Sequence, residues 1–298
     1  MNKKKSAAEA RRELESLATG GAGPRAMPDL KKAIVRIAIA LAVVWVVAII
    51  VPTWIPKAIA GVLTAVAIGA GVWFSRYVKK SQAIGALLQA AAAEGGRGGR
   101  EEALAKLESG FGKGDVQAAM AKAQLLMQDN PRVALTTLEA IDLGRQLGPI
   151  GDQVRAMRAT IHLTLGEPNE ARVLADAMEI GKQQDAKTRA MFATVAGEAW
   201  GRTGNAKKAV ETLELFNPDD PEFAELRIQM WRARAFACAG ANDMKGVGRA
   251  LRKLIEVNPQ LMAMFVGQKR VHPLLEREAR QLLMASGAVP RKMVRQRM

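Results

Sequence analysis

The sequence feature that most constrains the fold is an apolar stretch over residues 33–75, which contains only two charged residues. A transmembrane helix needs about 20 mostly apolar residues. As a single helix the stretch would be about 60 Å long, which is twice the hydrocarbon thickness of a bilayer. It is interrupted by the residues PTWIPK (52–57), whose two prolines disfavour helix in the residue before each of them. We therefore predict a transmembrane hairpin over 33–78, with spans at about 33–51 and 58–78.

Basic residues flank this hairpin and set its expected orientation. Residues 1–80 hold 13 Lys or Arg against 4 Asp or Glu, a large share of the net charge of +15. Lys31 and Lys32 precede the first span and further basic residues follow the second at 76–80, whereas the loop holds only Lys57. Because Lys and Arg favour the cytoplasmic side, we expect a multi-pass protein of the inner (cytoplasmic) membrane with both termini cytoplasmic.

The second span also carries small residues, Gly61, Ala65 and Gly69, at four-residue spacing. Such a stripe lets two membrane helices approach closely. The alternative is that the stripe only reflects the abundance of Gly and Ala in this chain.

The region from 115 to 260 is predicted to consist of helix–turn–helix units. In four of them a small residue begins the second helix, after a polar turn, at spacings of 37, 38 and 37 residues: Ala134, Ala171, Ala209 and Gly246. A two-helix unit cannot bury its apolar face alone, so neighbouring units are expected to stack. Bulky residues are expected to fill the space between units, namely Met178, Trp200, Leu213 and Phe216.

These units resemble the tetratricopeptide repeat family, whose unit has a small residue and then a bulky one in its first helix, and a small one after the turn. The matching sets are Ala159/His162/Ala171, Gly197/Trp200/Ala209 and, with one extra residue, Ala233/Phe236/Gly246; the set Lys122/Leu125/Ala134 departs at its first position. The resemblance implies a superhelix of about four units whose concave face, lined by first helices, binds a protein or peptide. It places these residues on that face: Gln153, Arg155, Arg158, Arg189, Arg227, Gln229 and Arg232.

The surplus of arginine among these seven residues favours an acidic partner or a terminal carboxylate as the ligand. The alternative is that the seven residues form an ordinary solvated surface.

The predicted fold class is all-α, a two-helix transmembrane hairpin followed by an α-α superhelical solenoid like that of tetratricopeptide repeats. The hairpin follows a basic segment, 1–32, that is either disordered or an amphipathic helix on the inner leaflet. Residues 79–114 form a helical linker or a partial repeat, and the repeats occupy 115–260. Residues 261–298 form capping helices and a basic tail.

We expect no enzyme, because the residues that carry catalysis are sparse. His162 occupies a packing position, His272 precedes a proline at a helix start, where a capping or turn role is expected, and Cys238 lies in an apolar pattern, where it is expected to be a small buried residue. The glycine-rich GGRGGR (95–100) follows no strand, so it is expected to be a flexible linker rather than a phosphate site. No catalytic, cofactor-binding or metal-binding residue is predicted, and no small-molecule substrate is expected.

The function predicted from the sequence is a membrane-anchored scaffold that holds a protein partner at the cytoplasmic face of the inner membrane. One alternative keeps the fold but puts the repeats outside the cytoplasm, in envelope assembly or as a chaperone. Two further alternatives are a membrane-tethered nucleic-acid binder and a subunit of a membrane complex. The favoured prediction expects no nucleic-acid partner.

Overall fold

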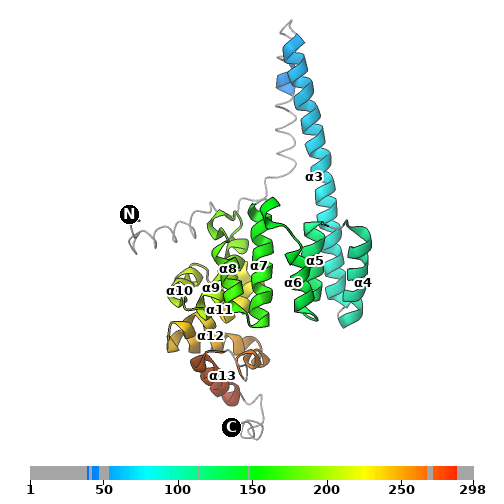
Figure 1. Ribbon diagram of the computed structural model, residues 1–298. Coiled ribbons are helices and arrows are strands. Elements are labelled where there is room, and N and C mark those ends of the chain that lie inside the picture. The colour runs from blue at the N-terminus through cyan, green and yellow to red at the C-terminus, as the bar shows by residue number, and fades with distance from the viewer. Residues whose placement is uncertain are drawn as a thin grey trace, which may run out of the picture. The chain divides into compact units, whose positions relative to one another are not determined.

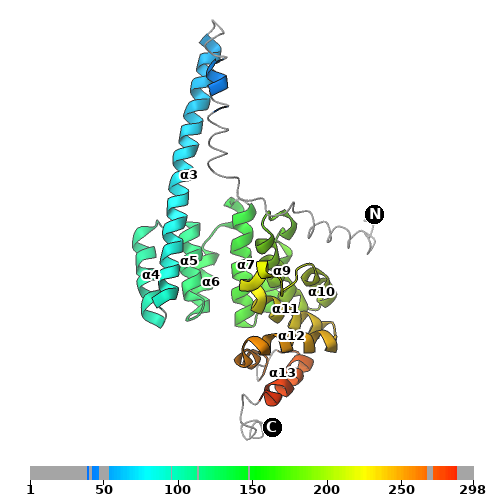
Figure 2. The ribbon, with the colours of Figure 1, turned by 180° about the vertical axis from the view of Figure 1, so that it is seen from behind.

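The computed structural model describes residues 39, 42–46, 54–94, 96–112, 114–146, 148–266 and 271–286 (Figures 1 and 2). Every regular element in these ranges is a helix, which confirms the all-α prediction for them. The α-helices are α3 (Trp54–Glu94), α4 (Gly96–Gly110), α5 (Val116–Leu126), α6 (Pro131–Glu139), α7 (Gly148–Leu165), α8 (Pro168–Asp176), α9 (Ala186–Arg202), α10 (Ala206–Glu214), α11 (Arg227–Gly240), α12 (Met244–Val257) and α13 (Pro273–Ala285). Short 3₁₀ helices are η1 (Leu143–Arg145), η2 (Ile180–Lys182), η3 (Pro221–Leu226) and η4 (Pro259–Met264).

The described part of the chain contains no helix with both the length and the apolarity that crossing a membrane requires. Of the first predicted span, 33–51, only residues 39 and 42–46 are described, and they are helical. The basic segment 1–32 and the tail 287–298 lie outside the described residues. The transmembrane hairpin therefore stays a prediction.

Helix α3 is longer than the second predicted span, because it runs without a break from Trp54 to Glu94. The helix therefore begins four residues before the predicted span and ends 16 residues after it, and the span itself stays a prediction. The helix starts inside the predicted loop, since Pro56 falls in its first turn, where a proline has no helical hydrogen bond to lose. It continues past residue 78 through an alanine-rich segment of strong helix formers.

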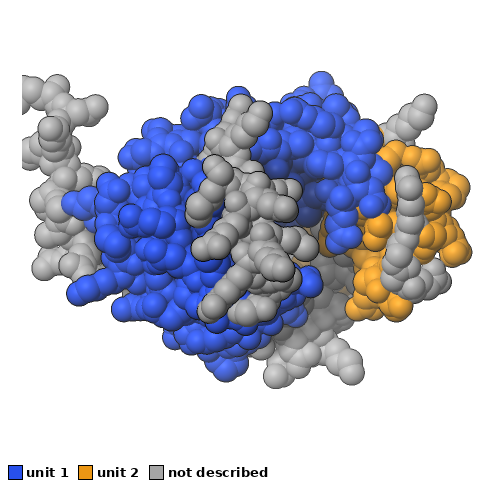
Figure 3. All heavy atoms as spheres, turned by 90° about the horizontal axis from the view of Figure 1, so that it is seen from below, with its two compact units in different colours: residues 1–22, 126–298 blue, residues 23–125 orange. Residues whose placement is uncertain are grey.

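The chain divides into two compact units, one of Gly23–Leu125 and the other of Met1–Ala22 with Leu126–Met298 (Figure 3). In the first, the second half of α3 packs with α4 and α5. The buried residues of this core are Ile84, Ala91, Ala103, Leu107, Ala118, Ala121 and Leu125.

The prediction of a flexible linker at 95–100 was wrong, because α4 begins at Gly96 within GGRGGR. Each glycine costs a helix about 1 kcal/mol relative to alanine. Burial of Ala103 and Leu107, one turn apart further along α4, offsets that cost. Tertiary packing thus overrides the local preference of the glycines.

In the unit that contains residues 126–298, the turn that follows the first helix of a helix pair has the same backbone geometry at intervals of 38 residues. Gly166, Gly204 and Asn242 have left-handed backbones, with φ of 75°, 88° and 56°, after α7, α9 and α11 respectively. In each case the next backbone N–H donates to a carbonyl five residues earlier, at 2.8–2.9 Å, in the pairs Glu167–His162, Asn205–Trp200 and Asp243–Cys238. This is the hydrogen bond of a Schellman motif, which ends a helix sharply.

The helices of this unit contact their neighbours in a regular order. Helices α7, α9, α11 and α13 contact one another in succession, and α8, α10 and α12 pack between consecutive members of that row. Contact between near neighbours only is the pattern of a helical repeat array. The residues expected to fill the space between units are all buried, as predicted: Met178, Trp200, Leu213 and Phe216.

Helices α9 and α11 cross with their backbones in contact. A Cβ atom added to Gly201 would lie 2.7 Å from Cα of Ala237. One added to Gly240 would lie 2.4 Å from the carbonyl oxygen of Gly201. Real Cβ atoms do not approach backbone this closely, so glycine is required at both positions.

We predict that Gly201→Ala will lower the free energy of unfolding by about 1–3 kcal/mol, because α9 and α11 must move apart to admit the methyl group. Urea denaturation followed by circular dichroism measures this. Gly248→Ala in α12 is the matched control: its Cβ would meet only the end of the flexible Arg252 side chain, at 3.4 Å. It should be neutral or stabilising. Equal effects of the two substitutions would contradict the proposed role of Gly201.

Candidate functional site

The first half of α3 exposes large apolar side chains on opposite sides of the helix. Leu63 and Val72 are nine residues apart, which at 3.6 residues per turn puts them on opposite faces. They are nevertheless 45% and 47% exposed. Other exposed apolar residues of this half are Trp54, Ile55, Ile59, Val62, Val66 and Ile68. A helix that is apolar all round belongs in a protein core or in a membrane, so this surface is a candidate interaction site.

One strip of the same helix is covered by the preceding helical segment, residues 42–46, which lies beside α3 in both views (Figures 1 and 2). Nε1 of Trp45 donates to Oγ1 of Thr64 at 3.1 Å, and Thr64 in turn donates to the carbonyl oxygen of Ala60 at 2.7 Å. Trp45 is nine residues before Trp54, and Thr64 is ten residues after it. Because the two partners are nearly equidistant from the start of α3, the two segments run antiparallel.

The small-residue stripe predicted for this contact is displaced by one residue. Gly61 is half-buried and Gly69 is exposed, and an added Cβ on either would meet nothing within 4 Å among the described residues. The contact instead uses Thr64, and Ala60, one turn before it, is completely buried. One residue rotates a helix position by about 100°, which is enough to move Gly61 off the contact.

In the other unit, the structure places the predicted partner-binding residues in two groups. Gln153 and Gln229 are exposed, as a binding surface requires. The five arginines instead bond to the protein itself.

Arg158 and Arg189 are occupied by backbone carbonyls. Arg158 Nη2 donates to the carbonyl oxygens of Leu138 and, at 2.9 Å, Ile141, at the end of α6. Burial lowers the pKa of the Arg158 guanidinium. Arg189 is buried, and its Nη1 donates to the carbonyl oxygens of Gln183 at 2.9 Å and Gln184 at 3.1 Å. Both arginines therefore close helix or turn ends.

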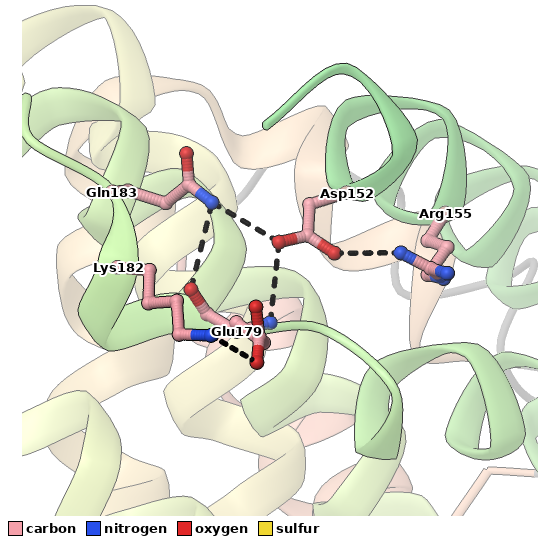
Figure 4. A network of polar contacts seen from close by, with 5 residues as sticks. All are labelled: Asp152, Arg155, Glu179, Lys182 and Gln183. Atoms are coloured by element: carbon pink, nitrogen blue, oxygen red, sulfur yellow. Dashed lines mark hydrogen bonds and ion pairs between the residues drawn. The ribbon is translucent and has the colours of Figure 1, made fainter. Parts of the chain in front are cut away.

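Arg155 belongs to a network around the buried Asp152 (Figure 4). Asp152 Oδ1 accepts from Arg155 Nη1 at 2.9 Å. Its other oxygen, Oδ2, accepts from the side-chain amide of Gln183 at 3.1 Å and from the backbone N–H of Glu179 at 3.3 Å. The network fastens the loop between α8 and α9 to the first turn of α7.

Arg227 bonds to the loop that precedes its own helix. Its Nε donates to the carbonyl oxygen of Pro218 at 3.3 Å and lies 3.8 Å from a carboxylate oxygen of Asp219. The arginine therefore holds the start of α11 against this loop.

Arg232 forms part of an ion cluster that the sequence analysis did not identify. Glu198 in α9 is 1% exposed. Its Oε2 accepts from Arg232 Nε at 2.9 Å, and its Oε1 lies 2.7 Å from Arg202 Nη2. Two guanidinium groups therefore share one carboxylate. A Glu and an Arg four residues apart in one helix were the available signal, but that spacing is common on exposed helix faces.

A cavity of about 290 Å³ lies beside this cluster. Its lining comes from the ends of α7, α9 and α11 and the starts of α8 and α13. The lining residues are Gly166, Pro168, Gly201, Arg202, Phe236, Gly240, Val271 and His272. The Arg202 guanidinium lies over the Phe236 ring, 3.7 Å from its centroid.

The remaining reactive side chains have structural roles. Cys238 is buried, as predicted, and burial raises the pKa of its thiol to about 11, which suppresses the nucleophilic thiolate at neutral pH. His272 caps α13 by accepting from the backbone N–H of Leu274 at 3.3 Å, which confirms its predicted role. His162 Nδ1 lies 2.9 Å from Oε2 of Glu167, and this hydrogen bond lowers the pKa of the Glu167 carboxyl. Among the described residues, no group of three His, Cys, Asp or Glu side chains is placed to hold a metal ion.

Comparison of this chain with protein-family models, with curated proteins and with solved structures found no match. The resemblance to tetratricopeptide repeats therefore stays a prediction.

We predict that Glu198→Gln will lower the free energy of unfolding by about 2–4 kcal/mol, because it leaves two half-buried guanidinium groups without a counter-charge. Urea denaturation measures the loss. The control is Glu211→Gln on the exposed side of α10, which should change stability by less than about 0.5 kcal/mol. If both variants are as stable as the parent, Glu198 does not hold the cluster together.

Proposed function

We propose that this protein is a membrane-anchored, non-enzymatic scaffold. An apolar hairpin over 33–78 embeds it in the membrane, and its helical array holds a protein or peptide partner. The observation that carries the proposal is the exposure of large apolar side chains on opposite sides of α3 between Trp54 and Val72. Exposed apolar patches of this kind mark a surface that another apolar phase covers.

The pairing of residues 42–46 with α3 supports a hairpin as the form of the anchor. A hydrocarbon phase offers no hydrogen-bond partners, so polar groups must be satisfied within the protein. Thr64 meets this requirement, because it bonds both to its own helix and to Trp45. Ala60, one turn before Thr64, is completely buried, and small residues of this kind are common where membrane helices pack.

The order of the helices in the second unit supports the role of partner holding. Helices α7, α9 and α11, the first helices of successive units, lie in a row and present a long surface. Repeat proteins bind their partners on surfaces of this kind. The recurrence of one turn at 38-residue intervals supports a helix–turn–helix repeat, four residues longer than the 34-residue tetratricopeptide unit. On this surface Gln153 and Gln229 are exposed for contact. The five arginines predicted to contact a partner bond to this protein itself, so the surplus of arginine among the predicted residues does not require an acidic partner.

We propose that the partner is held at the cytoplasmic face of the inner membrane, because basic residues are more frequent at the two ends of the hairpin than in its loop. Lys80, which follows the second predicted span, forms an ion pair with Asp115 within its own unit. Lys57, in the predicted external loop and at the start of α3, is exposed. The orientation rests on the basic residues at both ends of the hairpin against this single lysine.

To test the anchor, we predict that Val62→Lys with Val66→Lys will release the full chain from membranes. Each valine is 63% exposed, and a lysine near the centre of a membrane helix costs about 3 kcal/mol. Alkaline carbonate extraction of a membrane fraction measures the release. Gln82→Lys with Gln89→Lys adds the same charge to exposed positions of the same helix and should leave the protein in the pellet. Extraction of the parent chain itself by carbonate would contradict the anchor.

To test the orientation, we predict that a green fluorescent protein fused after residue 298 will fluoresce and that alkaline phosphatase fused there will be inactive. The first reporter works in the cytoplasm and the second outside it. Fusion after Lys57 should reverse the result, because that position is the expected external turn. Phosphatase activity at residue 298 would instead favour repeats outside the cytoplasm.

A further inference from the structure

The ion cluster beside the cavity carries an excess positive charge, and one of its members, Arg202, lines the cavity. Glu198 contributes one negative charge, whereas Arg202 and Arg232 contribute two positive charges. Burial lowers the pKa of the Arg202 guanidinium, and the charge of Glu198 opposes that shift. The side chains of Arg202 and Arg232 are only 20% and 27% exposed, so water screens this excess charge poorly. An anion in the cavity would balance it.

The hydrogen-bond donors that line the cavity also suit an anion. Arg202 Nη1 donates to the carbonyl oxygen of Leu163 at 3.1 Å and Nη2 lies 2.7 Å from Oε1 of Glu198, so each of these nitrogens keeps a second N–H for an anion. A guanidinium with donors to spare binds a carboxylate strongly, because the two planar groups match. His272 Nδ1 accepts from a backbone N–H, so the neutral ring carries its proton on Nε2 and adds a second donor.

The rest of the lining is apolar or lacks a side chain. Phe236 lies under the Arg202 guanidinium, and Val271 and Pro168 supply further apolar surface. Gly201 and Gly240 are fixed by the crossing of α9 with α11, and neither fills the cavity with a side chain. An inorganic anion would use the donors but leave the apolar wall uncovered, whereas an organic acid would use both.

We propose that this cavity binds a small organic monoacid, with its carboxylate on Arg202 and its apolar body against Phe236 and Val271. A volume of about 290 Å³ is at the small end of the range for ligand sites, which restricts the ligand to a compact molecule. We propose the acid as a bound ligand and not as a substrate, because among the described residues no Ser, Cys or Lys lines the cavity and His272, the histidine in its lining, is engaged as the cap of α13. This inference concerns residues 163–272 and does not depend on the membrane anchor.

The test uses the full chain in a non-ionic detergent and follows its thermal unfolding by tryptophan fluorescence. Sodium acetate, benzoate and phenylacetate serve as probes, with sodium sulfate and the neutral benzamide as controls at equal ionic strength. We expect benzoate or phenylacetate to raise the unfolding midpoint by a few degrees and to saturate, as ligands that bind only the folded state do. A response to sulfate as large as that to the organic acids, or no response to any acid, would overturn the proposal.

Two variants assign the response to the cavity. Val271→Phe fills the space from a half-buried position and should abolish the shift while the protein still unfolds cooperatively. Arg202→Lys keeps the charge next to Glu198 but loses the planar fork, so the apparent affinity should fall by at least tenfold. Val257→Phe, at an exposed site outside the cavity lining, is the matched control and should respond like the parent. An unchanged response of Val271→Phe would show that the acid binds elsewhere.

Discussion

The contact between the backbones of α9 and α11 is the constraint on which the rest of the helical array depends. Gly201 lies against Ala237, and the next residue of α9 and the preceding residue of α11 are Arg202 and Phe236. The close crossing therefore brings the guanidinium onto the ring. It also brings Glu198, one turn back on α9, within reach of Arg232 on α11. A larger residue at position 201 would separate the helices and take the ion cluster and the cavity apart together.

Several features of this array were predictable because they follow from local sequence. The apolar periodicity of each unit identified the residues that fill the gaps, such as Trp200 and Phe216, and these are buried. The proline after His272 marked a helix start, where the imidazole acts as a cap. Cys238 in a run of small residues was correctly expected to be buried. In each case the neighbouring residues determine the environment, so one sequence was sufficient.

The roles of the arginines were not predictable, because they depend on residues distant in the chain. The resemblance to tetratricopeptide repeats put Arg158 on the binding face of a first helix, but its acceptors are carbonyls at the end of the preceding helix. Arg189 similarly turns back onto the loop before α9. The prediction of a flexible linker at 95–100 failed for a related reason, since burial of Ala103 and Leu107 outweighs the glycines that precede them. A sequence pattern indicates which side chains share a face, but not which acceptors lie opposite that face.

The two halves of α3 differ in a way that the core of their unit does not explain. In the second half Ile84 and Ala91, seven residues apart, form one buried face, while Gln82 and Gln89 are exposed. This is the ordinary pattern of a helix between protein and water. In the first half the exposed residues are apolar on opposite sides, as at Leu63 and Val72. One continuous helix therefore exposes large apolar side chains in its first half, whereas the exposed residues that the structure describes in its second half are small or polar.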